Sequence, residues 1–250
     1  MPVSRRQVVT GLAAALTLPP LAVWRAVGPA AAGEGTCVLW PQLDEGPYYF
    51  DPKQVSPDIT GGRPGLPLKL TIKVQEFGSC KPFANARVDI WHADAGGIYS
   101  GYSGQGDKQD VSTKGETYLR GTQITDAGGE VTFNTIYPGW YPGRTPHIHV
   151  KAFLGNKMVV TGQAFFPDAF SARIYHAKAP YSARPAADTT NAVDGIFGDG
   201  EKNGGGTVLA LTEAGGGVEG RLTISVDATG QAARKAEGWG RYLKRKLTGG

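Results

Sequence analysis

The chain is poor in several residues that carry metal or redox chemistry: its 250 residues include two cysteines, two methionines and four histidines. With so few thiols, a cysteine-rich metal cluster or a dense disulfide scaffold is excluded. The interior also lacks an apolar run long enough to span a bilayer, so stable membrane insertion is not expected. By contrast, 37 glycines and 17 prolines predict many turns and few long helices.

The N-terminal segment has the features of an export signal. Residues 1–32 begin with Arg5 and Arg6, continue through an apolar stretch at 8–23 and end in small residues. This order is typical of a cleaved twin-arginine signal, so we expect the twin-arginine export machinery as a partner and a periplasmic or extracellular location. An amphipathic or membrane-anchoring helix is the alternative.

Without that segment the charge is nearly balanced. The chain has 26 basic and 22 acidic residues, and residues 1–32 hold three arginines and no acid, which leaves about +1. Nucleic-acid binding is therefore not indicated. Residues 231–250 form a basic C-terminal tail that includes Lys244 and Arg245, and such tails are usually solvated.

The two cysteines suggest one disulfide. Cys37 follows the expected cleavage point, and Cys80 lies in the loop EFGSCKPF at 76–83. In an exported protein, a bridge between them would attach the mature N-terminus to this loop. Two unrelated buried thiols are the alternative.

Short segments of alternating or β-branched character recur between turn residues, which predicts strands. They lie at 67–75, 86–93, 120–126, 130–136, 147–154, 157–166, 207–212 and 220–226. The turn Asp126-Ala-Gly-Gly129 between two of them predicts a hairpin. The pattern predicts an all-β fold, a single-domain β-sandwich over 33–230 with long loops such as 102–118; a barrel is the related alternative.

Half of the histidines lie in TIYPGWYPGRTPHIHV, residues 135–150. His147 and His149 are two positions apart in a predicted strand, so both side chains share a face and could bind one transition metal. Alone, this pattern is weak, and two half-exposed strand histidines explain it equally well. Tyr141 lies just upstream between proline and glycine pairs, and a phenolate suits Fe(III) better than Zn(II). A tyrosine that only packs the turn is the alternative, and it is the interpretation for Tyr137.

Three stretches together resemble the intradiol ring-cleavage dioxygenases, non-haem Fe(III) enzymes that include protocatechuate 3,4-dioxygenase and catechol 1,2-dioxygenase. They are VDIWHADAGGIYSGYS at 88–103, RGTQITDAGGEVTFNTIYPGWYPGRTPHIHV at 120–150 and GQAFFPD at 162–168. The similarity covers about residues 36–170, including EGPYY at 45–49, and the joint pattern is specific. With its export signal, the chain looks most like the secreted members.

The resemblance implies a metal site with one non-haem Fe(III) per chain. Two tyrosinates and two histidines of the family pattern fall on matching residue types, so the expected ligands are Tyr99, Tyr141, His147 and His149.

The resemblance also implies roles around the iron. Arg144 and Gln163 match family residues near the substrate and are expected to be catalytic together with the ligand Tyr141. We expect Pro47, Tyr48 and Trp140 to form the substrate-binding wall because of their positions.

Other candidates have simpler interpretations. Tyr102 lies three residues after Tyr99, but the GGxY register favours the earlier tyrosine as the ligand. His92 is expected to support the fold or the pocket wall, and His176 to be a surface or structural histidine. A cupin or zinc site would need another His or Glu soon after the histidine pair, and residues 150–157 contain none.

The implied activity is cleavage of a catechol-type ring between its two hydroxyl-bearing carbons. Fe(III) and O2 would convert the small aromatic diol into a cis,cis-muconate-type dicarboxylate. A homo-oligomer is left open. The competing hypotheses are a non-catalytic exported β-sandwich that binds a ligand or carbohydrate, and a peroxidase-like or hydrolytic metalloenzyme on the same scaffold.

Overall fold

The computed structural model describes residues 37–51 and 53–232. The expected export signal at 1–32 and nearly all of the expected basic tail at 231–250 lie outside the described residues. The expected domain boundaries therefore stay predictions.

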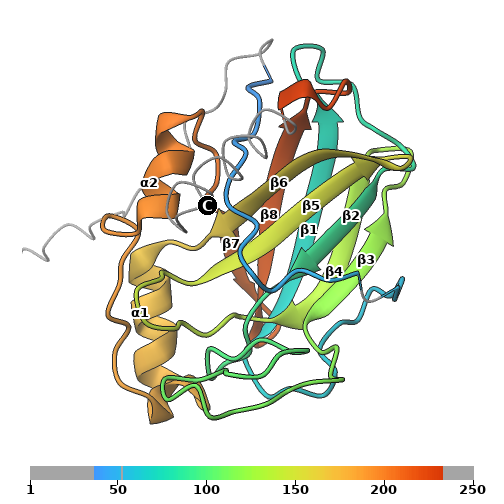
Figure 1. Cartoon of the computed structure of the whole chain (residues 1–250). Helices are drawn as coiled ribbons and strands as arrows, with labels where there is room; N and C mark the ends of the chain where they lie inside the picture. The colour runs from blue at the N-terminus through green and yellow to red at the C-terminus, as the bar shows by residue number, and fades with distance from the viewer. Residues whose placement is uncertain (1–36, 52, 233–250) are drawn as a thin grey trace, which may run out of the picture. The chain divides into compact units, whose positions relative to one another are not determined.

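Within the described residues, eight strands form two four-stranded sheets that pack face to face (Figure 1). One sheet has the order β4-β1-β8-β7 and the other the order β3-β2-β5-β6. Pairing is antiparallel except between β1 and β8, which run parallel. The predicted β-sandwich is confirmed. The strands are β1 (Pro67–Glu76), β2 (Arg87–Trp91), β3 (Arg120–Ile124), β4 (Glu130–Ile136), β5 (His147–Leu154), β6 (Lys157–Phe165), β7 (Ala210–Ala214) and β8 (Gly217–Val226).

The core lies between the sheets and follows from the alternation of apolar residues. In β1, Leu68, Leu70 and Ile72 are buried while the residues between them are more exposed. Strand β5 differs because it is buried on both faces over His147 to Ala152. Its outer face must therefore be covered by segments outside the sheets, and this covered face is where both histidines lie.

The described part of the chain also has two helices and a 3-10 turn, which lie beside the sandwich (Figure 1). The sequence pattern predicted none of them. They are α1 (Asp168–Ala177), η1 (Tyr181–Ala183) and α2 (Gly195–Lys202). Helix α2 contains two internal glycines, which disfavour helix formation. It forms because the Asp194 carboxylate caps it by accepting the amides of Ile196 and Phe197.

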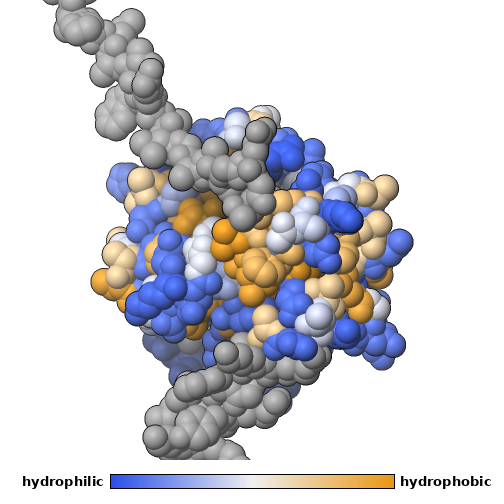
Figure 2. All heavy atoms as spheres, turned by 90° about the horizontal axis from the view of Figure 1, so that it is seen from above, coloured by the Kyte–Doolittle hydropathy of each residue, from blue (hydrophilic) through white to orange (hydrophobic). Residues whose placement is uncertain are grey.

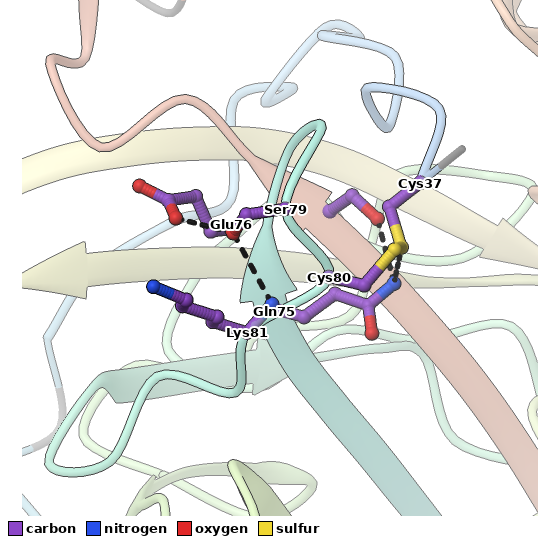
Figure 3. The surroundings of a disulfide bond; sticks show 7 residues. Cys37, Gln75, Glu76, Ser79, Cys80 and Lys81 are labelled. Carbon is purple, nitrogen blue, oxygen red and sulfur yellow. Dashed lines mark hydrogen bonds between the residues drawn. A yellow bond between two sulfur atoms is a disulfide. The ribbon is translucent and has the colours of Figure 1, made fainter. Parts of the chain in front are cut away.

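A disulfide joins Cys37 to Cys80, with the two Cα atoms 5.4 Å apart (Figure 3). The Gln75 amide donates to the Cys37 sulfur at 2.9 Å and to the Ser225 hydroxyl at 3.0 Å. The chain then runs across the sandwich, where the Leu43 amide donates to the Thr161 carbonyl at 2.9 Å. The bridge thus anchors an extended segment that ends at the candidate site.

The surface mixes polar and apolar residues. Figure 2 shows hydrophobic residues gathered near the middle of the face seen from above, with hydrophilic residues around them. No helix in the described ranges combines the length and apolar character that a membrane span requires.

Candidate metal centre

Four possible metal-donor atoms, from three segments of the chain, meet on the outer face of the β3-β2-β5-β6 sheet, under the loops that cover it. The Tyr99 oxygen lies 3.3 Å from Nε2 of His147 and 3.1 Å from Nε2 of His149. The Tyr141 oxygen lies 3.1 Å from Nε2 of His147. The structure therefore brings together all four residues that the family resemblance identified as ligands.

The histidines reach this point because of the register of β5. Residues two apart in a strand share a face, so His147 and His149 point outward while Ile148 packs into the core. The Trp91 ring stacks on His149 with 4.7 Å between centroids and 7° between planes. On the other side of β5, Gln163 is the cross-strand partner of His149. Strand pairing thus places the glutamine beside the donors.

Both histidines direct Nε2 at the cluster. Nδ1 of His147 donates to the Thr145 carbonyl at 2.7 Å, which leaves Nε2 without a proton. Burial, with Arg144 nearby, lowers the pKa of His147 to about 3. Burial, together with His147, lowers the pKa of His149 well below its ordinary value. Neutral imidazoles are the form that binds transition metals.

Tyr99 is held rigidly by the loop that follows β2. Its amide donates to Oε1 of Gln105 at 3.1 Å, and its carbonyl accepts from the Thr113 hydroxyl at 2.7 Å. The Asp94 carboxylate organises the preceding turn by accepting the Gly96 and Ile98 amides at 2.8 and 3.1 Å. The Tyr99 side chain is buried, and its phenol oxygen points at the two histidines.

Tyr141 belongs to a turn whose backbone packs closely against the Tyr99 loop at two glycines. Gly97 has a φ of +80°, and a Cβ there would clash with the Trp140 carbonyl oxygen. A Cβ on Gly139 would clash with the carbonyl oxygens of Asp94 and Ala95. Close backbone packing at both glycines therefore sets the separation of the two tyrosines.

Helix α1 and the 3-10 turn η1 hold the backbone of the same turn in place through two tyrosine hydroxyls. The Tyr175 hydroxyl of α1 donates to the Pro138 carbonyl at 2.9 Å, and the Tyr181 hydroxyl of η1 donates to the Tyr137 carbonyl at 2.6 Å. Tyr137 itself is buried in the core and bonds to Ser171, as the packing interpretation expected. The unpredicted helices therefore shape the site.

The donor set fits a ferric ion. Metal bonds to nitrogen and oxygen of about 2.0–2.2 Å place neighbouring ligands about 3 Å apart, close to the spacing of these donors. No three His, Cys, Asp or Glu side chains in residues 37–51 and 53–232 are grouped to hold a metal, so a metal held by the two histidines would require the tyrosine oxygens as well. Burial raises the pKa of both Tyr99 and Tyr141. Only a strongly charged, hard cation would stabilise two buried phenolates.

Arg144 and Gln163 adjoin the donors and contact each other. The Arg144 guanidinium donates to the Gln163 side-chain oxygen at 2.5 Å and lies 3.4 Å from the Tyr141 oxygen. Gln163 also donates to the Asp44 carbonyl at 2.8 Å. These contacts link β6, the Tyr141 turn and the segment that the disulfide anchors.

Asp194 is a buried residue that the sequence did not single out. Its carboxylate accepts from Nε of Arg144 at 2.8 Å and from the Thr145 amide at 3.0 Å, in addition to capping α2. Burial would raise the pKa of Asp194, but the Arg144 contact and the amide donors lower it overall. No sequence signal marks a partner 50 residues away, and helix α2, which Asp194 caps, was itself not predicted.

Arg120, at the start of β3, was also missed. Its side chain is fully buried and donates to the hydroxyl and carbonyl of Ser100 at 2.8 Å and to the Tyr48 carbonyl. Its guanidinium lies 6.0 Å from the centre of the Tyr99 ring and forms no ion pair with the described carboxylates. Burial lowers its pKa to about 10. Arg120 thus joins the Tyr48 segment to the Tyr99 loop.

The remaining sequence candidates lie outside the cluster. The Tyr102 hydroxyl donates to the Tyr49 carbonyl at 3.0 Å instead of joining the donors. His92 is fully buried and bonds to Ala93 and Thr135, so it supports the fold. His176 is exposed at the end of α1.

A cavity of about 230 Å³ opens beside the two candidate tyrosine ligands, and Tyr48 lines it together with Tyr99 and Tyr141. Among the described residues, its lining includes neither Pro47 nor Trp140. Pro47 is exposed, and the Trp140 side chain is buried beneath the Arg184 guanidinium at 4.3 Å. Their expected contact with substrate stays a prediction.

Comparisons with known proteins point to one family. A family model described as "Dioxygenase" matches residues 45–170. An intradiol ring-cleavage dioxygenase from Tetranychus urticae is 34% identical, covers 76% of this chain and 95% of its own, and superposes with a TM-score of 0.67. The dioxygenase domain of a dioxygenase–carbohydrate-binding fusion from Streptomyces sp. SirexAA-E is 31% identical over 76% of this chain and 98% of its own, with a TM-score of 0.55.

A curated relative gives the same family from sequence alone. The protocatechuate 3,4-dioxygenase beta chain of Burkholderia cepacia is 33% identical over 120 residues, which are 44% of this chain and 48% of the relative. The chain thus spans less than half the length of the curated relatives it matches. The family model nevertheless covers all four candidate donors. The chain belongs to the intradiol ring-cleavage dioxygenase family.

Proposed function

We propose that the protein is an Fe(III)-dependent dioxygenase that cleaves a catechol-type ring between its two hydroxyl-bearing carbons. The reaction would incorporate both atoms of O2 and give a cis,cis-muconate-type dicarboxylate. The observation that carries the proposal is the convergence of two phenol oxygens and two imidazole nitrogens within 3.1–3.3 Å beside a cavity.

Each donor contributes a defined property to iron binding. Tyr99 and Tyr141 would supply anionic oxygens, while His147 and His149 would supply neutral nitrogens. Two phenolates balance most of the charge of a ferric ion, which favours Fe(III) over softer metals. When bound, this ion would act as a Lewis acid for the oxygens of the substrate.

The two tyrosines are held differently, and this supports different roles. Tyr99 is fixed at both its amide and its carbonyl, by Gln105 and Thr113. Tyr141 lies in a tight turn where its carbonyl accepts the Arg144 amide at 3.1 Å. The Tyr141 phenol is therefore the better candidate to move and to take a proton from the incoming catechol at its oxygen.

Arg144 supplies a fixed positive charge next to the substrate position. Asp194 and Gln163 orient its guanidinium, so little reorganisation is needed when negative charge develops on a substrate oxygen. Gln163, held by Asp44, would orient the substrate. These two residues provide electrostatic and positional catalysis and not a covalent step.

The direct test is turnover of catechol under ¹⁸O2 by the iron-loaded protein. We expect a dicarboxylate that carries two ¹⁸O atoms and retains all six ring carbons in an open chain. An aldehyde-containing extradiol product, or no O2 uptake despite full iron occupancy, would contradict the proposal. The second result would favour a ligand-binding module on this scaffold.

We also propose that the protein is exported through the twin-arginine pathway to the periplasm or the medium. A disulfide between Cys37 and Cys80 supports an oxidising compartment. Mass spectrometry of the secreted or periplasmic protein should reveal a mature N-terminus near residue 33. Replacing both Arg5 and Arg6 with lysine should leave the precursor in the cytoplasm, and unchanged export would contradict the pathway.

A further inference from the structure

Residues 44–49, which we call the crossing segment, pass over the outer face of the β3-β2-β5-β6 sheet beside the donors (Figure 1). Gly46 has a φ of +70°, and a Cβ on it would lie 3.4 Å from Cε1 of His149, so its backbone packs on that imidazole. The Tyr48 and Tyr99 rings are 4.8 Å apart between centroids, and both line the cavity beside the donors. The position of the crossing segment therefore sets one side of this cavity.

Each strand of this sheet sends one side chain to the crossing segment. The four contacts reach different residues, so the segment is held along its whole length. They are Gln163 of β6 to the Asp44 carbonyl at 2.8 Å, Lys151 of β5 to the Glu45 carboxylate, Asp89 of β2 to the Tyr49 hydroxyl at 2.9 Å, and Arg120 of β3 to the Tyr48 carbonyl. The sheet that supplies the two histidines thus also holds the segment beside them.

Lys151 differs from the other three because it contacts the segment at two points. Its ammonium pairs with the Glu45 carboxylate and lies 4.0 Å from the centre of the Tyr49 ring, in a cation–π contact. Glu45 and Tyr49 flank the three residues that lie closest to the donors. Lys151 follows His149 by two positions in β5, so its side chain is on the same face. One cation therefore ties both ends of this short loop to the strand of the histidines.

The contact at Tyr49 is rigid because its acceptor is fixed from several directions. Asp89 is buried and is the cross-strand partner of Lys151. Its carboxylate accepts from the Arg87 guanidinium at 2.6 and 2.8 Å and from the Thr122 hydroxyl at 2.7 Å. The Tyr49 ring is thus held by its hydroxyl on one strand and by the ammonium on its face from the next strand.

Stability alone does not explain a lysine at this position. Lys151 is only 8% exposed, and lysine is rarely buried unless it is paired. Replacing a buried ion pair with apolar side chains is often neutral or stabilising, because both charges must be removed from water. A long side chain that ends in a charge can, however, fix two groups at once relative to the strand that carries it. The geometry therefore favours a role in positioning.

Resting on the proposed function, we propose that Lys151 is a positioning residue for the binding of catechol. Lys151 is not among the described residues that line the cavity, so it acts through the crossing segment. By holding Glu45 and Tyr49, it keeps Tyr48 against Tyr99 and preserves the shape of the cavity that receives the ring.

The test is a double-mutant cycle in catechol affinity, measured without O2. Iron-loaded wild type, Lys151→Met, Tyr48→Ala and the double variant are titrated with catechol, and the change in visible absorption reports binding. We expect Lys151→Met to keep its iron and to bind catechol about tenfold more weakly. In the Tyr48→Ala background the same substitution should change the affinity less than about twofold, because Tyr48 transmits the effect.

Three further variants separate position from charge and from folding. Lys69→Met removes the same charge from an ion-paired lysine of the other sheet, 3.9 Å from Glu219, and should bind catechol as the wild type does. Glu45→Gln leaves Lys151 in place and should also weaken binding, which covers the case in which Lys151→Met does not fold. Lys151→Arg keeps a cation for both contacts and should bind more tightly than Lys151→Met.

Wild-type affinity in Lys151→Met or in Glu45→Gln would overturn the inference, as would an equal loss with and without Tyr48. Loss of iron from folded Lys151→Met would overturn it too, because the lysine would then support the donors instead of the cavity. If catechol does not bind the iron-loaded wild type, the proposed function itself is contradicted. The two failures are therefore distinguishable.

Discussion

At the scale of single residues, Asp194 connects the cap of helix α2 to the Arg144 guanidinium. Asp194→Asn keeps one side-chain oxygen that can accept a hydrogen bond. It removes the negative charge that pairs with the Arg144 guanidinium, so this guanidinium should be held less firmly. We predict that kcat/KM for catechol falls about 10- to 100-fold while iron content is unchanged. Asp199→Asn, an exposed substitution in the same helix, is the control. A merely structural role would instead lower iron content or the melting temperature without altering kcat in the folded fraction.

His92 gives a prediction about pH. Burial lowers its pKa from 6.5 to about 4. Below pH 6.5 the unfolded chain takes up a proton that folded His92 does not, so stability falls as the pH drops from 6.5 toward 4. Between pH 7 and pH 5 the metal-free wild type should lose ~2 kcal/mol more than His92→Asn. Urea unfolding at both pH values measures this, and parallel losses would contradict it.

The donor residues could be predicted from the sequence because their spacing along the chain is characteristic. His147 and His149 share a strand face, and the family pattern added Tyr99 and Tyr141. Arg120 and Asp194 could not be found in this way. Arg120 contacts the backbone of segments 20 and 72 residues away, and no residue type in the sequence marks such partners.

At the scale of elements, the contact between the Tyr99 loop and the Tyr141 turn is the critical feature. Gly139→Ala would place a methyl group against the carbonyls of Asp94 and Ala95, so the turn must move away. We predict loss of stoichiometric iron binding together with a lower melting temperature. Gly198→Ala in α2, where a Cβ meets nothing within 4 Å, should bind iron normally and gain up to ~1 kcal/mol.

Metal analysis and thermal unfolding of both variants measure this prediction. Normal iron binding by Gly139→Ala would show that the two loops can separate without disrupting the donors.

Strands were easier to predict than helices for a physical reason. A strand such as β1 alternates buried and exposed residues, and this period is visible in the sequence. The bounds of one strand were wrong: the sequence predicted a strand at 207–212, whereas β7 spans Ala210–Ala214. Helix α2 depends on a capping aspartate and tertiary contacts and not on its own helix propensity. Its glycines therefore masked it.

At the scale of the whole described molecule, the disulfide ties the first described residue to the sandwich. Cys37 and Cys80 are 43 positions apart, and closing a loop of this length stabilises a fold by about 4 kcal/mol in the chain-entropy description. The double variant Cys37→Ser/Cys80→Ser should lose about this free energy of unfolding. Because the anchored segment holds Gln163 through Asp44, KM for catechol should also rise.

Denaturant unfolding and steady-state kinetics measure the two effects separately. Full stability in the double variant would show that hydrogen bonds such as Leu43 to Thr161 suffice to hold the segment.

The sandwich architecture could be predicted from strand spacing and turn residues, whereas the way the loops cover its outer face could not. That covering depends on contacts between segments far apart in the sequence, such as Tyr175 and Tyr181 beneath the Tyr141 turn. The donor cluster is a product of this arrangement as much as of its four residues.

The most direct test of the metal centre is the visible spectrum of iron-loaded protein, alone and with catechol in the absence of O2. Tyrosinate bound to Fe(III) should give a charge-transfer band that colours the protein reddish and moves to longer wavelength with catechol. Tyr141→Phe should shift and weaken the band. A colourless protein with full iron occupancy would show that Tyr99 and Tyr141 do not bind the metal, and would contradict the proposed dioxygenase.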